Sequence, residues 1–504
     1  MIHESLEASI TDKKNIVSHH SIPLHRIDIR LLLLCLIALP LPGFTQDSVT
    51  GEAAKEVGSK TYETVLARVI AVYPNLQSAI LQIQHSTLEL NRIYATLGWN
   101  AVASTSYSHD LAIFGTPANI LIARGALTRK LESGDSITLD ASYNRTDNDV
   151  VFIPSLPNPS NNSAVNLSYR RPLLKGAGNI EYQSLQEAAK ARIDSSKADE
   201  YKLRDVLARQ IATLYFGLAT IEVNLANTRD GIGRLRRLHE YVVRNRKLGI
   251  SEEKDILQSQ ARLDRKLSAL SALITAKNQQ LYNLNRLMNI PASTQFTSRL
   301  NYSKQDVPSH QVLHNEVFNY SPSLSNAYAS KKVAESNIKI QRDNKKDSID
   351  VIVSVGARVK TGPAENTYID QSDLAGKVGL EYRAALDKQG LRATLQQALL
   401  SRDIADNQIR QLKIDLNNEI DRLRGLIEDQ KKSIASNIRL KRAEKKKFDE
   451  AISRFRTGLT TTADLINFEE DLSRAESALA NSRVDLVSTL NELARLRGTV
   501  WKDL

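Results

Sequence analysis

A duplicated segment, in which a long helical pattern breaks at a glycine and resumes near an aspartate, most constrains the fold of this chain. In one copy Gly249 precedes Asp255 by six positions, and in the other Gly458 precedes Asp464 by the same spacing. Glycine readily adopts the left-handed backbone that ends a helix. The duplication therefore predicts a repeat architecture in which each copy contains a hairpin of two helices.

Long helices with a heptad pattern flank both glycines, at about 179–289 and about 388–498. The apolar positions step by three and four residues, as in Leu207, Ile211, Leu214, Leu218, Ile221 and Leu225. Such a seam predicts helices that pack lengthwise on one another. The helix that ends before Gly249 would reach roughly 100 Å at 1.5 Å per residue. His239 lies at a heptad position, so we expect a packing residue and not a metal ligand.

Two groups of short segments, at about 99–171 and about 349–386, alternate apolar and polar residues. In the first group the apolar positions include Ile137, Leu139, Ala141, Tyr143, Val165, Leu167 and Tyr169. This alternation is typical of a membrane β-barrel with a water-filled lumen. It fits equally a β-sandwich with one face in water.

The order helix, strands, long helix, glycine turn, helix occurs twice, which predicts repeats at 61–300 and 301–504. Pro74 and Pro322 open corresponding helices, because proline suits the first helical turn. These prolines lie 248 positions apart, whereas Tyr169 and its counterpart Tyr382 lie 213 apart. The first copy therefore carries 35 extra residues among its strands. We expect one additional hairpin within about 119–146, turning at residues 132–135.

The N-terminus has the pattern of a secretory signal. A basic flank precedes a short apolar run, and small residues follow it. The run is far shorter than the roughly 20 residues that span a bilayer, which disfavours the alternative of a membrane anchor. We expect a signal peptide at 1–45 and a linker at 46–60. Cys35 is the only cysteine, so the mature chain would have no disulfide or thiol chemistry.

Composition argues against an enzyme. Aromatic residues make up only 5% of the 504 positions and charged residues 25%, which favours long helices over a packed globular enzyme. The histidines lack metal-ligand spacing, and no phosphate-binding loop or nucleophile motif is present, so we expect no cofactor. The net charge of +11 alone allows an acidic partner, a membrane surface or nucleic acid. The basic clusters lack interleaved aromatic residues, so we expect no nucleic acid binding.

The duplicated order resembles the TolC family of outer-membrane channel proteins of efflux and type I secretion. Three features carry the resemblance: the two glycine turns, the proline-led helix openings, and the strand-to-helix junction with Pro172, Gly176 and Gly178. The resemblance implies a mainly α protein with membrane β-structure. It implies a homotrimer whose strands close one β-barrel in the outer membrane, contacting lipid, and whose helices continue it as a periplasmic coiled-coil barrel.

The same resemblance implies a passive conduit that works with a periplasmic adaptor (membrane fusion) protein and an inner-membrane transporter. A member of the family usually contributes four strands per chain, so the additional hairpin departs from the pattern. It either widens the barrel or folds outside it. The alternative function is a periplasmic coiled-coil adaptor or scaffold without a pore. A scaffold explains the helical hairpins but not the amphipathic strands in both repeats.

In the family the helical turns form the periplasmic entrance. The resemblance implies a pore constriction at Asp464 and Asn467, where the family often has a second aspartate, and closing contacts at Asp255. Phe455 and Thr460 stand where the family has an aromatic hydroxyl and an arginine. The alternative interpretation is that the aspartates are ordinary first-turn acids, favoured by the helix dipole.

Charge near the turns follows a pattern of its own. The helices that enter the turns are basic, at 229–247 and 439–456, and the helices that leave them are acidic. Antiparallel packing would therefore form matched charge pairs. The pattern fits a solvated surface, since exposed pairs contribute little, or a docking surface for an adaptor.

Overall fold

The structure is a computed structural model that describes residues 58–111, 117–151, 153–300 and 307–501. The predicted signal peptide and most of the predicted linker lie outside the described residues. The elements of the first repeat are α1 (Tyr62–Val72), α2 (Pro74–Ala95), β1 (Trp99–Leu111), β2 (Pro117–Lys130), β3 (Ser136–Asn148), β4 (Ser160–Pro172), α3 (Ile180–Lys247) and α4 (Glu253–Met288). Those of the second are α5 (His310–Tyr320), α6 (Pro322–Asn344), β5 (Ser348–Ala364), β6 (Thr367–Arg383), α7 (Gln389–Arg456) and α8 (Thr462–Leu496).

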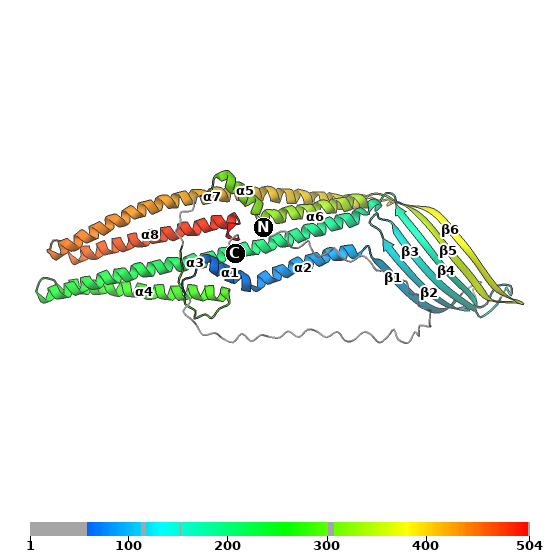
Figure 1. Ribbon diagram of the computed structural model, residues 1–504, viewed down its shortest axis with the longest axis horizontal. Coiled ribbons are helices and arrows are strands. Elements are labelled where there is room, and N and C mark those ends of the chain that lie inside the picture. The colour runs from blue at the N-terminus through cyan, green and yellow to red at the C-terminus, as the bar shows by residue number, and fades with distance from the viewer. Residues whose placement is uncertain (1–57, 112–116, 152, 301–306, 502–504) are drawn as a thin grey trace, which may run out of the picture. The chain divides into compact units, whose positions relative to one another are not determined.

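The predicted order of helix, strands, long helix, glycine turn and helix is confirmed in both repeats (Figure 1). Pro74 and Pro322 each occupy the first turn of a helix, where the missing backbone N–H costs nothing. The Ser321 side chain accepts a hydrogen bond from the backbone N–H of Leu324 and so caps α6. Local sequence chemistry therefore explains where these helices begin.

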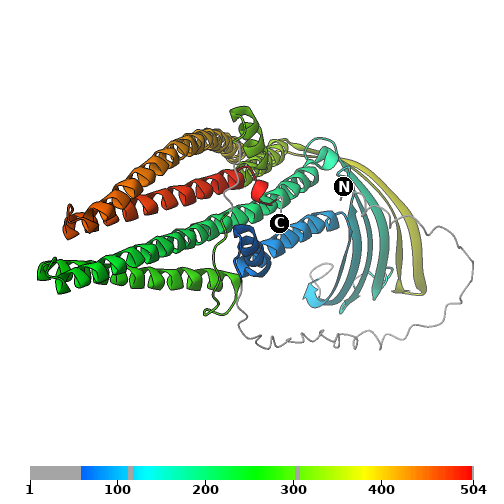
Figure 2. The ribbon, with the colours of Figure 1, turned by 60° about the vertical axis from the view of Figure 1, so that its left-hand side comes forward.

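All six strands form one antiparallel sheet in the order β1-β2-β3-β4-β5-β6. The two repeats join where β4 pairs with β5, and Figure 2 shows the six strands curving together as one sheet. The predicted additional hairpin is β2 and β3, joined by a turn at residues 131–135. It is part of the sheet and lies between β1 and β4.

Helix α3 is the centre of the helical part, because it packs against α2, α4, α6 and α8. Its buried heptad residues are Leu207, Ile211, Leu218, Leu225, Ile232, Leu235 and Val242. Burying a leucine or isoleucine side chain stabilises a fold by about 1.5–3 kcal/mol, so this seam is a large favourable contribution. His239 of α3 lies 2.8 Å from the Ser259 hydroxyl of α4, at the helix interface where a packing residue was predicted.

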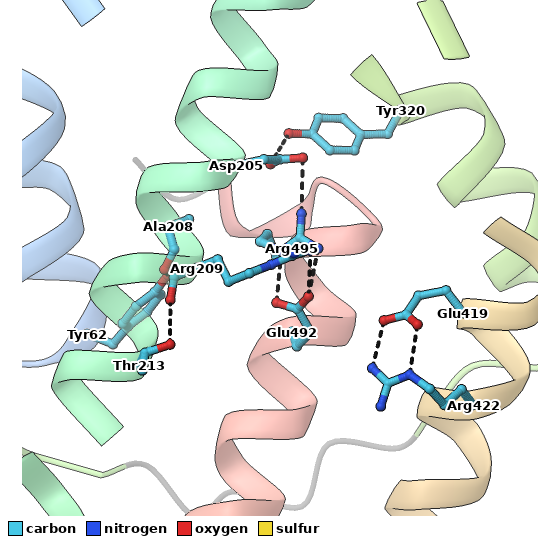
Figure 3. Close-up of polar contacts among 10 residues, drawn as sticks. All are labelled: Tyr62, Asp205, Ala208, Arg209, Thr213, Tyr320, Glu419, Arg422, Glu492 and Arg495. Atoms are coloured by element: carbon cyan, nitrogen blue, oxygen red, sulfur yellow. Dashed lines mark hydrogen bonds and ion pairs between the residues drawn. The ribbon is translucent and has the colours of Figure 1, made fainter. Parts of the chain in front are cut away.

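A polar cluster ties the C-terminal end of α8 to α3 and α5 (Figure 3). The Arg495 guanidinium lies 3.2 Å from Asp205 of α3 and donates to Glu492, one turn earlier in α8. Tyr320, the last residue of α5, donates to the other oxygen of Asp205. Arg209 of α3 completes the cluster at 3.2 Å from Glu492. Both repeats contribute to these contacts, so the cluster holds them together at this level.

Candidate functional site

One face of the sheet is apolar. Directly paired residues of antiparallel strands point to the same side, so the register defines each face. One row across all six strands is Ala101, Leu127, Leu139, Leu167, Val355 and Gly376. Many large side chains of this face are 40% exposed or more, including Leu139, Leu167, Val355, Leu374, Val378 and Leu380. A protein surrounded by water would cover such a face.

Aromatic residues border the apolar face at both ends of the strands. Trp99, Tyr169 and Tyr382 lie toward the helices, and Tyr107, Tyr143 and Tyr368 lie toward the opposite end. Trp99 and Tyr107 are eight residues apart on β1, which corresponds to roughly 27 Å along the strand. An apolar band between two aromatic girdles is the pattern of an outer-membrane β-barrel.

The opposite face is mostly polar, with Val102, Ile122 and Ile352 among its apolar exceptions. One row of this face consists of Ser104, Arg124, Ser142, Ala164, Arg358 and Asp373. Asn166 donates to Asp140 across neighbouring strands, and Arg170 pairs with Asp350 and lies 3.4 Å from Glu381. The predicted alternation is therefore confirmed. The sandwich alternative is wrong for the described part of the chain, where all strands belong to a single sheet.

The strand-to-helix junction holds the turn of the β2–β3 hairpin. Gly176 and Gly178 have left-handed backbones, with φ of 82° and 69°. The N–H of Gly176 donates to Asp343 of α6, and Pro172 ends β4 opposite Asp350. A Cβ at Gly134, in the hairpin turn, would clash with the carbonyl oxygen of Gly176. The two turns thus pack backbone against backbone.

Both predicted glycine turns have the same backbone. The φ angle is 74° at Gly249 and 75° at Gly458. The N–H of the residue after each glycine donates to a carbonyl five positions earlier, at 2.9 Å in both turns. This pattern satisfies carbonyls that the helix end leaves without partners. The two hairpins therefore close in the same way.

The aspartates after the turns start the next helices. Asp255 accepts a hydrogen bond from the backbone N–H of Glu252 at 3.1 Å, which completes a capping box. Asp464 accepts from the Thr461 hydroxyl at 2.7 Å, and its own N–H donates back to that hydroxyl. Both aspartates thus have a helix-start role. Asp464 and Asn467 are exposed and one turn apart on α8.

Phe455 and Thr460, which stand where the family has an aromatic hydroxyl and an arginine, lie in different surroundings. The Phe455 ring at the end of α7 packs on Tyr241 of α3, with ring centroids 5.3 Å apart. An aromatic contact of this kind joins the two hairpins without a hydroxyl. Thr460 lies in the turn that precedes α8.

Buried charges join the two hairpins near the turns. Arg234 of α3 lies 3.1 Å from Glu469 and 3.2 Å from Glu476, both on α8. We call these three residues the inter-hairpin cluster. The Glu469 side chain is only 1% exposed, so its charge needs compensation, and Arg234 is the cation that forms its ion pair.

The α4 helix adds two contacts beside this cluster. Arg262 lies 2.6 Å from Glu470, and the Lys266 ammonium donates to the Ser473 hydroxyl at 2.6 Å. Burial lowers the pKa of Lys266. Sequence reasoning missed these cross-repeat contacts. The one sequence feature that pointed to a close contact here is Gly231, one turn before Arg234. The structure gives the reason, because a Cβ at this position would lie 2.9 Å from Glu469 Oε1.

The predicted charge pairs within each hairpin are present. Lys447 of α7 lies 3.0 Å from Asp471 of α8, and Arg246 of α3 lies 3.6 Å from Glu253 of α4. Across residues 58–501, apart from the undescribed gaps, no group of three metal-ligating side chains occurs.

Comparisons with known proteins identify the fold. No protein-family model and no curated protein sequence matches the chain. Among solved structures, the chain is similar to the outer membrane protein VceC of Vibrio cholerae, with 14% identity and a TM-score of 0.63, over 87% of this chain and 96% of that one. It is also similar to the CmeC outer membrane channel of Campylobacter jejuni, with 12% identity and a TM-score of 0.61, over 92% and 93%.

A third similar structure is the open state of the MtrE outer membrane channel of Neisseria gonorrhoeae, with 15% identity and a TM-score of 0.59, over 87% of this chain and 88% of that one. These matches span both repeats, including strands and helical hairpins. The chain therefore has the fold of the TolC-family outer-membrane channels, the fold that its sequence predicts.

Proposed function

We propose that this protein is an outer-membrane channel, the exit duct of a tripartite efflux pump or a type I secretion system. The observation that carries the proposal is the apolar sheet face between two aromatic borders, backed by a polar face. Lipid suits the first face and a water-filled lumen the second. After export directed by a signal peptide at 1–45, the helices would extend into the periplasm and the channel would act as a passive conduit.

The open sheet supports an assembly of several copies. Strands β1 and β6 each leave one edge unpaired within the described residues. Lipid offers no hydrogen-bonding partner for such edges, so only a closed barrel is stable there. Neighbouring copies can pair edge to edge around a ring. Following the resemblance, the assembly is a homotrimer.

The helical turns are the proposed periplasmic entrance. In this proposal Asp464 and Asn467 line the constriction, and Asp255 contributes to its closed state. Asp464 uses one carboxylate oxygen, Oδ2, for its helix cap. The inter-hairpin cluster and the Tyr241–Phe455 contact would hold the hairpins together. They would replace the contacts of the aromatic hydroxyl and the arginine that the family has at positions 455 and 460.

The charged surface of the hairpins is the proposed contact for a periplasmic adaptor protein, which in turn binds an inner-membrane transporter. Many of these charges are exposed, so the contact would depend on ionic strength. High salt should weaken adaptor binding in a pull-down with the intact trimer.

The experiment that tests the function is conductance in a planar lipid bilayer. Purified protein in detergent should insert and produce discrete, uniform conductance steps. The variant Asp464→Ala should change the step size or the block by multivalent cations, and the exposed Glu450→Ala on α7 is its matched control. A water-soluble monomer without conductance would instead support a periplasmic scaffold.

A further inference from the structure

We infer that the β2–β3 hairpin enlarges the channel, so that three copies of the six-stranded sheet close an eighteen-stranded barrel. In this barrel the free edge of β1 in one copy pairs with the free edge of β6 in the next. The inference rests on the proposed trimeric channel and adds the strand number and the seam between copies.

The hairpin cannot leave the sheet without taking β1 with it. β1 is paired along its whole length, from Trp99 to Leu111, with β2 and with no other strand of the described part. β3 in turn pairs with β4 from Ser136 to Thr146. A barrel that excluded the hairpin would need a new pairing between β1 and β4.

The hairpin carries both faces of the barrel wall. Leu127 of β2 and Leu139 of β3 lie in the apolar row, and Arg124 and Asp140 lie on the polar face. An insertion that folded outside the membrane would not need one apolar and one polar face in line with those of the neighbouring strands. β3 therefore has the full side-chain alternation of a wall that separates lipid from lumen, whereas β2 has it from Ala123 to Thr128 and also places Ile120 and Ile122 on the polar face.

The turn of the hairpin is fixed at the level where the other strands meet the helices. The Tyr169 hydroxyl of β4 donates to Asp135 at 2.8 Å, and the Asn179 side chain donates to the carbonyl of Leu131 at 3.2 Å. Gly134 packs against the Gly176 carbonyl. These contacts place β2 and β3 in register with the rest of the sheet.

The two free edges are suited to each other. β1 runs away from the helices and β6 returns toward them, so β6 of one copy and β1 of the next are antiparallel. Each edge strand carries an aromatic border residue near both ends: Trp99 and Tyr107 on β1, Tyr382 and Tyr368 on β6. All thirteen residues of β1 are exposed in one copy. Pairing with a second copy removes the exposed edge, which otherwise promotes aggregation.

The enlarged barrel has a wide lumen. Barrel diameter grows roughly linearly with strand number, so eighteen strands give a barrel about 1.5 times as wide as twelve. Sixteen to eighteen strands are also the number at which barrels leave an open aqueous channel.

Disulfide cross-linking between engineered cysteines tests the strand order. Without the signal peptide the chain has no cysteine, so two introduced cysteines can form a disulfide only with each other. Ala103→Cys on β1 is combined in turn with Gly125→Cys on β2, Val165→Cys on β4, or Val378→Cys on β6. All four positions belong to the apolar face. Leu374→Cys and Gly376→Cys extend the β6 scan, because the register between copies determines which position reacts.

The enlarged barrel predicts a cross-link within one chain for the β1–β2 pair, covalent trimers on a denaturing gel for one β1–β6 pair, and no cross-link for the β1–β4 pair. A β1–β4 cross-link within one chain, together with covalent trimers and intact conductance, would overturn the eighteen-stranded barrel and leave the channel standing. Absence of both covalent trimers and conductance would overturn the channel itself.

Discussion

The two repeats of this chain are alike at one end and different at the other. Their glycine turns share the same φ angle within 1° and are each followed by a capping box, but the described residues form four strands in the first repeat and two in the second. A helix end must satisfy fixed backbone groups, so its geometry tolerates little change. A sheet accepts a further hairpin, because two added strands return the chain to the side from which it left.

The largest expected effect, a loss of assembly, comes from removing one strand of the hairpin instead of both. Deleting residues 117–148 removes β2 and β3 and joins β1 to β4 through residues 112–116 and 149–159. We expect this variant to assemble, because α3 still leaves the sheet on the helical side. Deleting 117–135 removes β2 and the turn alone and leaves an odd number of strands, so α3 would start on the wrong side. This second variant should form no trimer on a semi-native gel. Equal assembly of both variants would contradict the conclusion that the sheet gains or loses strands only in pairs.

The inter-hairpin cluster is the next most sensitive feature, because it joins the two otherwise similar hairpins. Arg234→Ala removes the ion-pair partner of the buried Glu469 carboxylate and should lower the free energy of unfolding by about 3–5 kcal/mol. Urea unfolding of the detergent-solubilised protein measures this loss.

The exposed Arg236→Ala on the same helix is the matched control and should change stability by no more than about 0.5 kcal/mol. The double variant Arg234→Met, Glu469→Leu should recover much of the loss, because an apolar pair can replace a buried ion pair. A loss as small as that of the control would show that the charges do not hold the hairpins together.

The cluster at the other end of α8 should show a distinct pH dependence. Burial alone raises the pKa of Glu492, but the hydrogen bonds and charges of Arg495 and Arg209 outweigh this effect and hold the pKa below its ordinary value of 4.5. Its stabilising contribution is therefore full above pH 4.5 and is lost as the pH falls through the folded-state pKa.

Glu492→Gln should consequently cost about 1.5–3 kcal/mol at pH 7, the range for hydrogen bonds to charged groups. The difference from the wild type should shrink below pH 4.5. Unfolding curves at pH 7 and pH 3.5 measure it, and a difference that stays constant with pH would rule out the charged pair as its source.

The smallest effects should come from the two turns, and they should be equal. Gly249→Ala and Gly458→Ala each place a side chain in a left-handed backbone, which costs about 1–2 kcal/mol. An added Cβ meets no atom within 4 Å at either position, so backbone strain is the only expected cost.

Gly425→Ala in the middle of α7 is the control, because its Cβ also meets open space and its backbone is helical. This variant should gain about 0.5–1 kcal/mol. Clearly unequal losses at Gly249 and Gly458 would contradict the equivalence of the two turns.

The features that were predictable from the sequence depend on neighbouring residues. The glycine turns, the proline-led helix starts and the alternation of Ile137 to Tyr143 follow from backbone chemistry and periodicity. The additional hairpin followed from the unequal offsets of Pro74 and Tyr169 to their counterparts. Its place inside the sheet did not, because strand pairing is set by contacts between distant segments.

The inter-hairpin cluster was not predictable for the same reason. Arg234 and Glu469 are separated by 235 positions and belong to different repeats. Heptad patterns show which residues face another helix but not which helix lies opposite. Likewise, Asp255 and Asp464 were recognised as first-turn acids or pore residues, and only the hydrogen bonds revealed their capping boxes.

The most direct test of the central claim compares two adjacent residues of β3 in outer-membrane vesicles. Ala141→Cys lies on the apolar face and Ser142→Cys on the polar face. A membrane-impermeant, water-soluble thiol reagent should label Ser142→Cys through the lumen and leave Ala141→Cys unlabelled in the lipid. Equal labelling of both positions, or labelling of Ala141→Cys alone, would contradict an outer-membrane channel with a polar lumen.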